Sequence, residues 1–157
     1  MLKISSKSST KLSIVLSVIF FAALVFGAVI MPKFVGLALG VPIGFFNEKL
    51  LVRSDAAIIL AIAYLVLVSA AVANVFLLNL LLRVEKELVF TEKSVSLIRG
   101  ISWCVIVIGI LFASLGYYFA MSFVVSAAAF FLGLCLRVVK NVIEKATEIK
   151  NENDLTV

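Results

Sequence analysis

Residues 83–99 read Arg-Val-Glu-Lys-Glu-Leu-Val-Phe-Thr-Glu-Lys-Ser-Val-Ser-Leu-Ile-Arg, and this charged segment lies between two long apolar runs. It holds seven charged residues, whereas residues 56–82 before it and residues 100–136 after it hold none. A helix of a water-soluble domain needs polar residues on its outer face. We therefore expect the charged segment to be a water-exposed connection between membrane-spanning helices.

Composition and length agree with that expectation. The chain has 157 residues, of which 64% are hydrophobic and 15% charged, against about 25% charged in an ordinary globular domain. Because roughly 20 apolar residues cross a hydrocarbon core of about 30 Å, the length allows four spans and one tail. We predict a single all-α domain over residues 1–157, an integral membrane four-helix bundle. Its spans are expected at about residues 12–31, 56–82, 99–117 and 122–139.

The segment between the first two spans contains both prolines of the chain. Residues 12–31 are uncharged, and their length favours a retained span over a signal peptide. Pro32 and Pro42 are expected to break helix continuity. The stretch 32–54 is nevertheless mostly apolar, so it should lie along the outer membrane interface or fold back onto the bundle. The sequence leaves its placement open.

The charged segment contains a signal for the start of the third helix. Thr91 can cap the helix, Glu92 suits the positive end of the helix dipole, and Phe90 can pack on Val95. Ser94 stands where a complete capping box has Glu or Gln.

A short uncharged turn, residues 116–122, joins the third and fourth helices. The two helices must therefore run antiparallel as neighbours, and residues at equal depth have numbers that sum to about 239. These depth pairs are Cys104 with Cys135, Ala113 with Ser126, and Gly109 with Phe130. Two small-residue patterns favour close helix approach: Gly109-xxx-Ala113 and Ala129-xxx-Gly133.

Residues 140–157 are expected to extend the fourth helix into the cytosol as an amphipathic tail. An apolar stripe at helical spacing supports this: Val138, Val139, Val142, Ile143, Ala146 and Ile149. The stripe could contact the charged segment of the same chain, the lipid surface, or another protein.

The distribution of Lys and Arg predicts the orientation. Eleven lie near the N-terminus, the charged segment and the tail, and three lie in the connection after the first span. Because basic residues are enriched on the cytosolic side, both termini are expected in the cytosol of a cell-membrane protein. The same scattering of basic residues argues against direct nucleic-acid binding, although the net charge is +5.

We find no pattern that predicts catalysis, a cofactor or a metal. The chain has no histidine and no charged residue deep within a span, so we expect it not to be an enzyme. The main polar group within the bundle is expected to serve interhelical hydrogen bonding and packing rather than a substrate or ion site. It consists of Asn74, Asn79, Ser102, Cys104 and Cys135.

Two stretches resemble the bacterial membrane family called domain of unknown function 2975. They are residues 82–101, with Phe90-Thr91 at the start of the third helix, and the terminal residues 152–157, Glu-Asn-Asp-Leu-Thr-Val. The chain differs from the family pattern before the Phe-Thr step, at Glu87 or Leu88, and after it, at Ser94. The family has no established activity.

Members are often encoded beside a small helix-turn-helix regulator, so the resemblance implies a cytosolic transcription regulator as partner. The residues it suggests for partner contact are Phe90, Thr91, Glu152, Asn153, Asp154 and Leu155. The first hypothesis is thus a non-enzymatic membrane protein that docks a cytosolic partner. The alternatives are a small transport or immunity-type membrane protein and a structural accessory subunit. The sequence does not indicate an oligomeric state.

Overall fold

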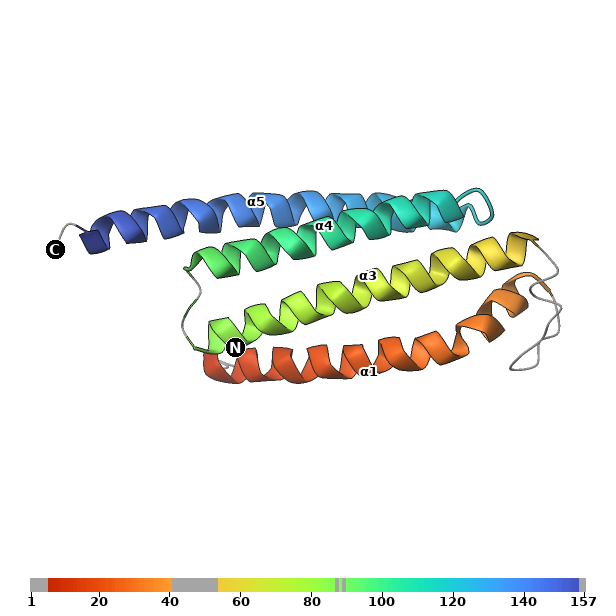
Figure 1. Cartoon of the computed structure of the whole chain (residues 1–157), viewed down its shortest axis with the longest axis horizontal. Coiled ribbons are helices and arrows are strands. Elements are labelled where there is room, and N and C mark those ends of the chain that lie inside the picture. The colour runs from red at the N-terminus through yellow and green to blue at the C-terminus, as the bar shows by residue number, and fades with distance from the viewer. Residues whose placement is uncertain (1–5, 41–53, 87, 89, 156–157) are drawn as a thin grey trace, which may run out of the picture.

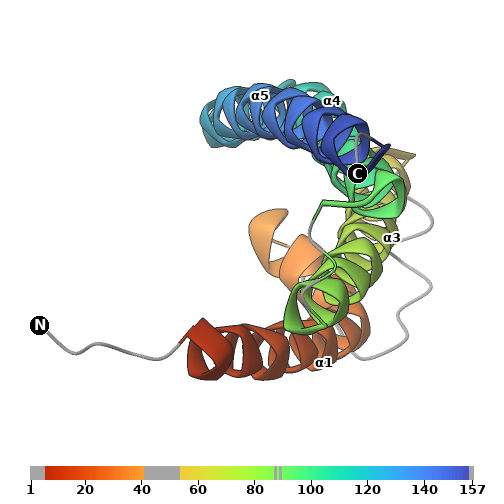
Figure 2. The same ribbon diagram turned by 90° about the vertical axis from the view of Figure 1, so that its left-hand side faces the viewer.

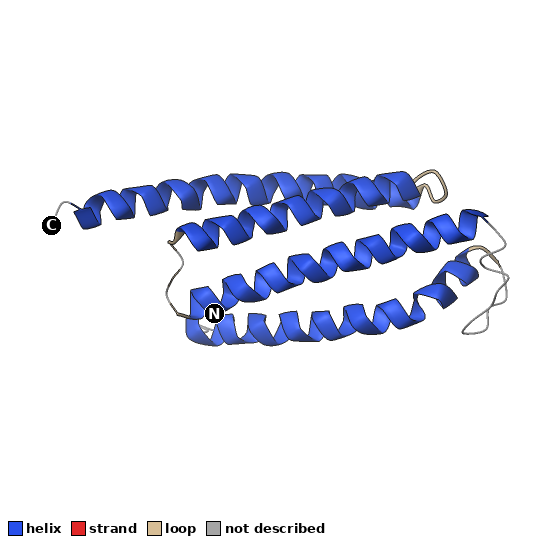
Figure 3. Ribbon diagram, viewed as in Figure 1, coloured by secondary structure: helices blue, strands red, loops and turns tan. Residues whose placement is uncertain are grey.

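The computed structural model describes residues 6–40, 54–86, 88 and 90–155. Within these residues the chain forms four helices and no strand (Figure 3). The helices are α1 (Ser6–Ala38), α3 (Ser54–Glu85), α4 (Glu92–Leu115) and α5 (Met121–Leu155). Each is long and apolar enough to cross a membrane. The predicted all-helical fold, with four helices long and apolar enough to cross a membrane, is therefore confirmed for the described residues.

The helices pack mainly on their neighbours in chain order, α1 on α3, α3 on α4 and α4 on α5. Seen end-on, they form an arc with α1 and α5 at its two ends, so the bundle is open on one side (Figure 2). The start of α1, the α3–α4 connection and the end of α5 lie at the same end of the molecule (Figure 1).

Pro32 lies inside α1, so the prediction that it ends the first helix is wrong. Proline has no amide hydrogen to donate to the carbonyl four residues earlier, which is that of Ala28. The Tyr64 hydroxyl on α3 donates to this carbonyl at 3.1 Å. A neighbouring helix thus satisfies the freed carbonyl, which is how prolines are tolerated in membrane helices. In Figure 1, α1 bends in its last turns.

The last turns of α1 pack on the beginning of α3. Val35 is 5% exposed and belongs to a small core with Ala56, Ile59 and Leu115. The helix ends before Gly40, whose φ of 65° favours glycine. Up to Ala38 this stretch therefore continues α1 and packs on α3, and it does not fold back. Pro42 and the rest of 41–53 lie outside the described residues.

Helices α4 and α5 form the predicted antiparallel hairpin. A Cβ atom built on Gly109 would lie 3.4 Å from the Phe130 ring, which confirms this depth pair. The Ser126 hydroxyl donates to the Gly109 carbonyl at 2.8 Å, and the Ser102 hydroxyl donates to the Gly133 carbonyl at 3.0 Å. Each helix thus has a buried serine hydroxyl that donates to a glycine carbonyl of the other helix. The small glycines allow the two backbones to approach closely enough for these bonds.

The start of α4 has the predicted cap. Thr91 is extended, with φ −139° and ψ 149°, and its hydroxyl oxygen accepts a hydrogen bond from the Ser94 amide at 3.4 Å. The fully buried Ser94 side chain donates to the Leu88 carbonyl at 3.0 Å. Ser94 therefore ties the helix start to the preceding connection, which accounts for a small hydroxyl residue at this position.

Candidate functional site

Helix α5 continues without interruption beyond Leu136, where its uncharged run ends, and lies beside the start of α4. Val95 on α4 and Thr147 on α5 line the space between the two helices, and each is only 5% exposed. The Thr147 hydroxyl donates to the Ile143 carbonyl of its own helix at 2.8 Å, so its polar atom is satisfied. The α4–α5 end therefore combines a tightly packed contact with a satisfied buried hydroxyl.

Glu144 connects the two helices through its carboxylate. Arg99 on α4 donates to it at 3.3 Å, and Lys140, one turn earlier on α5, also donates to it. The hydrogen bond from Lys140, together with the nearby charge of Arg99, lowers the pKa of Glu144 from its ordinary value. Because the Arg99 and Glu144 side chains are 57% and 37% exposed, solvent weakens the attraction. The pair therefore links α4 to α5 but contributes little to the stability of the fold.

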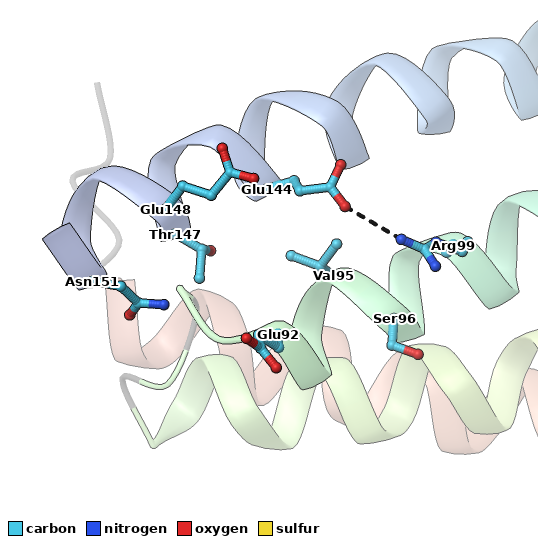
Figure 4. A pocket seen from close by; sticks show the side chains of 8 residues that line it. All are labelled: Glu92, Val95, Ser96, Arg99, Glu144, Thr147, Glu148 and Asn151. Atoms are coloured by element: carbon cyan, nitrogen blue, oxygen red, sulfur yellow. Dashed lines mark hydrogen bonds and ion pairs between the residues drawn. The ribbon is translucent and has the colours of Figure 1, made fainter.

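A cleft of about 350 Å³ separates the two helix ends (Figure 4). It is lined by Glu92, Val95, Ser96, Arg99, Glu144, Thr147, Glu148 and Asn151. Within the described part of the chain, Glu92 and Glu148 form no ion pair. The carboxylates therefore make the cleft acidic at its outer end, beyond the Arg99–Glu144 pair.

The apolar stripe of α5 divides between two environments. Ile143 and Ala146 are half-buried near α4. Val138 and Val142 are each 63% exposed, and Ile149 is 59% exposed. Helix α5 thus packs on the start of α4 mainly through Thr147 and its neighbours, and it leaves part of its apolar face uncovered.

The structure brings two of the suggested partner-contact residues together. Phe90 and Asn153 line one shallow recess, with Ala146, Ile149 and Lys150 between them. Thr91 is the cap of α4 and uses its hydroxyl within the chain. Glu152, Asp154 and Leu155 lie at the end of α5.

The polar residues predicted within the bundle do not form one cluster. Asn74 is 3% exposed and bonds Ser17 of α1: its amide nitrogen donates to the Ser17 carbonyl at 3.3 Å, and the Ser17 hydroxyl donates to its oxygen at 3.2 Å. Asn79 is exposed and makes no hydrogen bond to another described residue. Cys104 and Cys135 are free thiols. The sequence prediction did not identify Ser17 or Tyr64, because nothing in a uniformly apolar helix marks which face meets a neighbour.

Among the described residues, no three His, Cys, Asp or Glu side chains are placed to hold a metal ion.

A family model described as "Protein of unknown function (DUF2975)" matches residues 8–157. The chain belongs to this family. The match includes all four described helices of this DUF2975 protein, so the resemblance seen in two short stretches extends over nearly the whole chain. No curated protein and no solved structure matches the chain.

Proposed function

We propose that this DUF2975 protein is a non-enzymatic membrane protein that docks a cytosolic protein on the end of α5 and the start of α4. The main support is the uncovered apolar row of Val142 and Ile149, which lies on α5 beyond the predicted span 122–139. An apolar row exposed on a helix outside the membrane is typical of a protein-binding surface. Ile149 lies about 18 Å beyond Arg137 along the helix axis, at ~1.5 Å per residue. A protein therefore covers it more readily than the lipid surface does.

The proposed orientation places this surface in the cytosol. The end of the molecule that holds it also holds the start of α1 and the α3–α4 connection (Figure 1). Eleven of the 14 Lys and Arg residues belong to these three parts of the sequence. The positive-inside rule then favours a cytosolic location for this end.

The chemistry of the surface suggests the kind of partner. The exposed apolar row lies on the same helix end as the acidic cleft that contains Glu92 and Glu148. This combination suits a partner helix with apolar residues on one face and Lys or Arg beside them. A small helix-turn-helix regulator, the partner implied by the family resemblance, has such basic helices.

The test combines crosslinking with a direct binding measurement. A photo-crosslinking amino acid at Val142 should form an adduct with one cytosolic protein in native membranes. That protein, once purified, should bind the full chain in detergent. We expect Ile149→Asp to weaken binding at least tenfold, because it puts a charge into an apolar contact. Lys11→Asp, a substitution to the same residue at an exposed position of α1, away from the α4–α5 surface, should have a much smaller effect.

Adducts with lipid alone would contradict the docking proposal. So would a purified partner whose affinity is unchanged by Ile149→Asp.

A further inference from the structure

A second pocket lies between α4 and α5, on the membrane side of the Arg99–Glu144 pair. It has a volume of about 300 Å³ and is lined by Arg99, Ser102, Trp103, Arg137, Lys140 and Asn141. It contains three cationic side chains, and among the described residues the only carboxylate bonded to them is that of Glu144. The pocket therefore keeps an excess of positive charge.

Most of the free cationic hydrogen-bond donors of this pocket belong to its arginines. The Ser102 hydroxyl bonds the Gly133 carbonyl, and the Asn141 side-chain oxygen accepts from Lys140 at 3.3 Å. The Arg137 guanidinium carbon lies 4.7 Å from the centre of the Trp103 ring, a cation–π contact that fixes its position. Arg137 donates no hydrogen bond to any residue in the described part of the chain. Its N–H groups, and those of Arg99 not used by Glu144, can therefore receive an anion.

The pocket lies at the depth of lipid headgroups. Arg99 is the last charged residue before the apolar run of α4, and Arg137 is the first charged residue after the apolar run of α5. Trp103, 54% exposed beside them, is a residue type that prefers the interface between hydrocarbon and water. The basic groups thus lie where the phosphates of the surrounding leaflet lie.

We propose that this pocket binds the phosphate of an anionic phospholipid. Arg99 and Arg137 supply charge-assisted hydrogen bonds to the phosphate oxygens, because guanidinium donors match phosphate geometry. Trp103 holds Arg137 in place and contacts the lipid where its acyl chains join the headgroup. The pocket shares Arg99 with the acidic cleft of the proposed protein-docking surface, but none of its lining residues belongs to the exposed apolar row.

The fluorescence of Trp103 can report on this site, because Trp103 is the only tryptophan of the chain. The full chain would be reconstituted in mixtures of brominated phosphatidylglycerol with unbrominated phosphatidylcholine of matched acyl chains, and in the reverse mixtures in which only phosphatidylcholine is brominated. Bromine on the lipid quenches tryptophan fluorescence, so the quenching at each mixture gives the relative affinity of the two lipids. We expect a preference for phosphatidylglycerol. Arg137→Gln and Arg99→Gln should each reduce it by roughly fivefold, the effect of one basic residue near an anionic surface.

Two further variants separate binding from folding. Lys145→Gln removes a cation from an exposed position of α5 outside the pocket and should leave the preference unchanged. Glu144→Gln removes the carboxylate that competes for Arg99 and should increase the preference. A variant that merely disturbs the fold would not strengthen binding, so this opposite sign is specific to the proposal.

Equal quenching by the two lipids would overturn the proposal. So would equal effects of Arg137→Gln and Lys145→Gln. Inorganic phosphate, added to vesicles of phosphatidylcholine alone, should leave Trp103 fluorescence unchanged. A saturable change at low millimolar phosphate, without a lipid preference, would assign the pocket to a soluble anion instead.

Discussion

Among single side chains, Tyr64 has the clearest structural role, because its hydroxyl donates to the carbonyl that Pro32 leaves without a partner. We expect Tyr64→Phe to lower the free energy of unfolding by about 0.6–1.7 kcal/mol, the range for hydrogen bonds between membrane helices. Unfolding in mixed micelles with increasing denaturing detergent would measure it. In a Pro32→Ala background the new backbone amide would bond the Ala28 carbonyl itself, so the same change should cost much less. Equal losses in both backgrounds would contradict this account.

Asn74 is the buried polar residue that joins α1 to α3. We expect Asn74→Leu to lower the free energy of unfolding by about 1 kcal/mol, because two interhelical hydrogen bonds are lost. Asn79→Leu is the matched control on the same helix, and it should be nearly neutral since Asn79 bonds no described residue. Detergent-induced unfolding of the two variants compares them directly. A larger loss for Asn79→Leu would show that the two amides are assigned wrongly.

Asn74 and Pro32 show which interhelical contacts can be predicted from the sequence and which cannot. That a buried amide such as Asn74 needs a partner on another helix follows from the high energy of an unpaired polar group in hydrocarbon. The partner itself, Ser17, does not follow, because α1 and α3 are apolar on all sides and lipid sets no inward face. The effect of Pro32 on the helix could not be predicted for the same reason. A proline removes a hydrogen bond within its own helix, but the sequence does not show that the Tyr64 hydroxyl of the neighbouring helix replaces it.

The helix hairpin of α4 and α5 depends on close approach at its small residues. A Cβ atom at Gly133 would lie 2.8 Å from Ile106 Cγ1, which is too close, whereas one at Gly27 would lie 3.9 Å from the Leu67 side chain. We expect Gly133→Ala to destabilise the protein by about 1–3 kcal/mol through overpacking. Gly27→Ala should be neutral or stabilising by up to about 1 kcal/mol, because alanine favours helix. The two substitutions are chemically identical, and a reversed order in the same unfolding assay would reject the hairpin packing.

The register of the hairpin and the start of α4 were predictable because local rules set them. A turn of a few residues between antiparallel helices leaves little freedom of register, so Gly109 and Phe130 meet as expected. The cap at Thr91 follows from the unsatisfied amides of a first helical turn. The sequence did not predict which residues of the α5 stripe are buried. Hydrophobicity would favour burial of Val142 over Thr147, but Thr147 packs against α4 and Val142 stays exposed.

At the α4–α5 end, the ion pair that joins the two helices depends on pH, because it requires an ionised Glu144. The hydrogen bond from Lys140 and the charge of Arg99 lower the pKa of Glu144 when the helices are together. The link is therefore fully present above the ordinary carboxyl pKa of about 4.3, and it is lost as pH falls through the lowered value. We expect spin labels at Ser96 and Asn151 to show a longer or broader distance distribution below that range. Glu144→Gln should remove this pH dependence, and its persistence in that variant would assign it to another group.

For the molecule as a whole, the number of helices was predictable and their open arrangement was not. Charges cannot remain in hydrocarbon, so the charged segment separates the spans in any arrangement. An apolar helix face can meet lipid as readily as another helix, and nothing in the sequence required α1 and α5 to lie at opposite ends of an arc. The proposed partner surface also depends on which end of the bundle, along the helix axes, faces the cytosol.

Thiol accessibility in intact cells tests the four-span, common-end arrangement most directly. In a chain with Cys104 and Cys135 replaced by alanine, single cysteines would be placed at Lys93, Tyr117 and Asn151. A reagent that cannot cross the membrane should label the cysteine at Tyr117, which is 88% exposed in the α4–α5 turn. It should leave those at Lys93 and Asn151 unlabelled until the cells are opened. Labelling of position 151 together with 117 in intact cells, or of 93 without 151, would contradict the account.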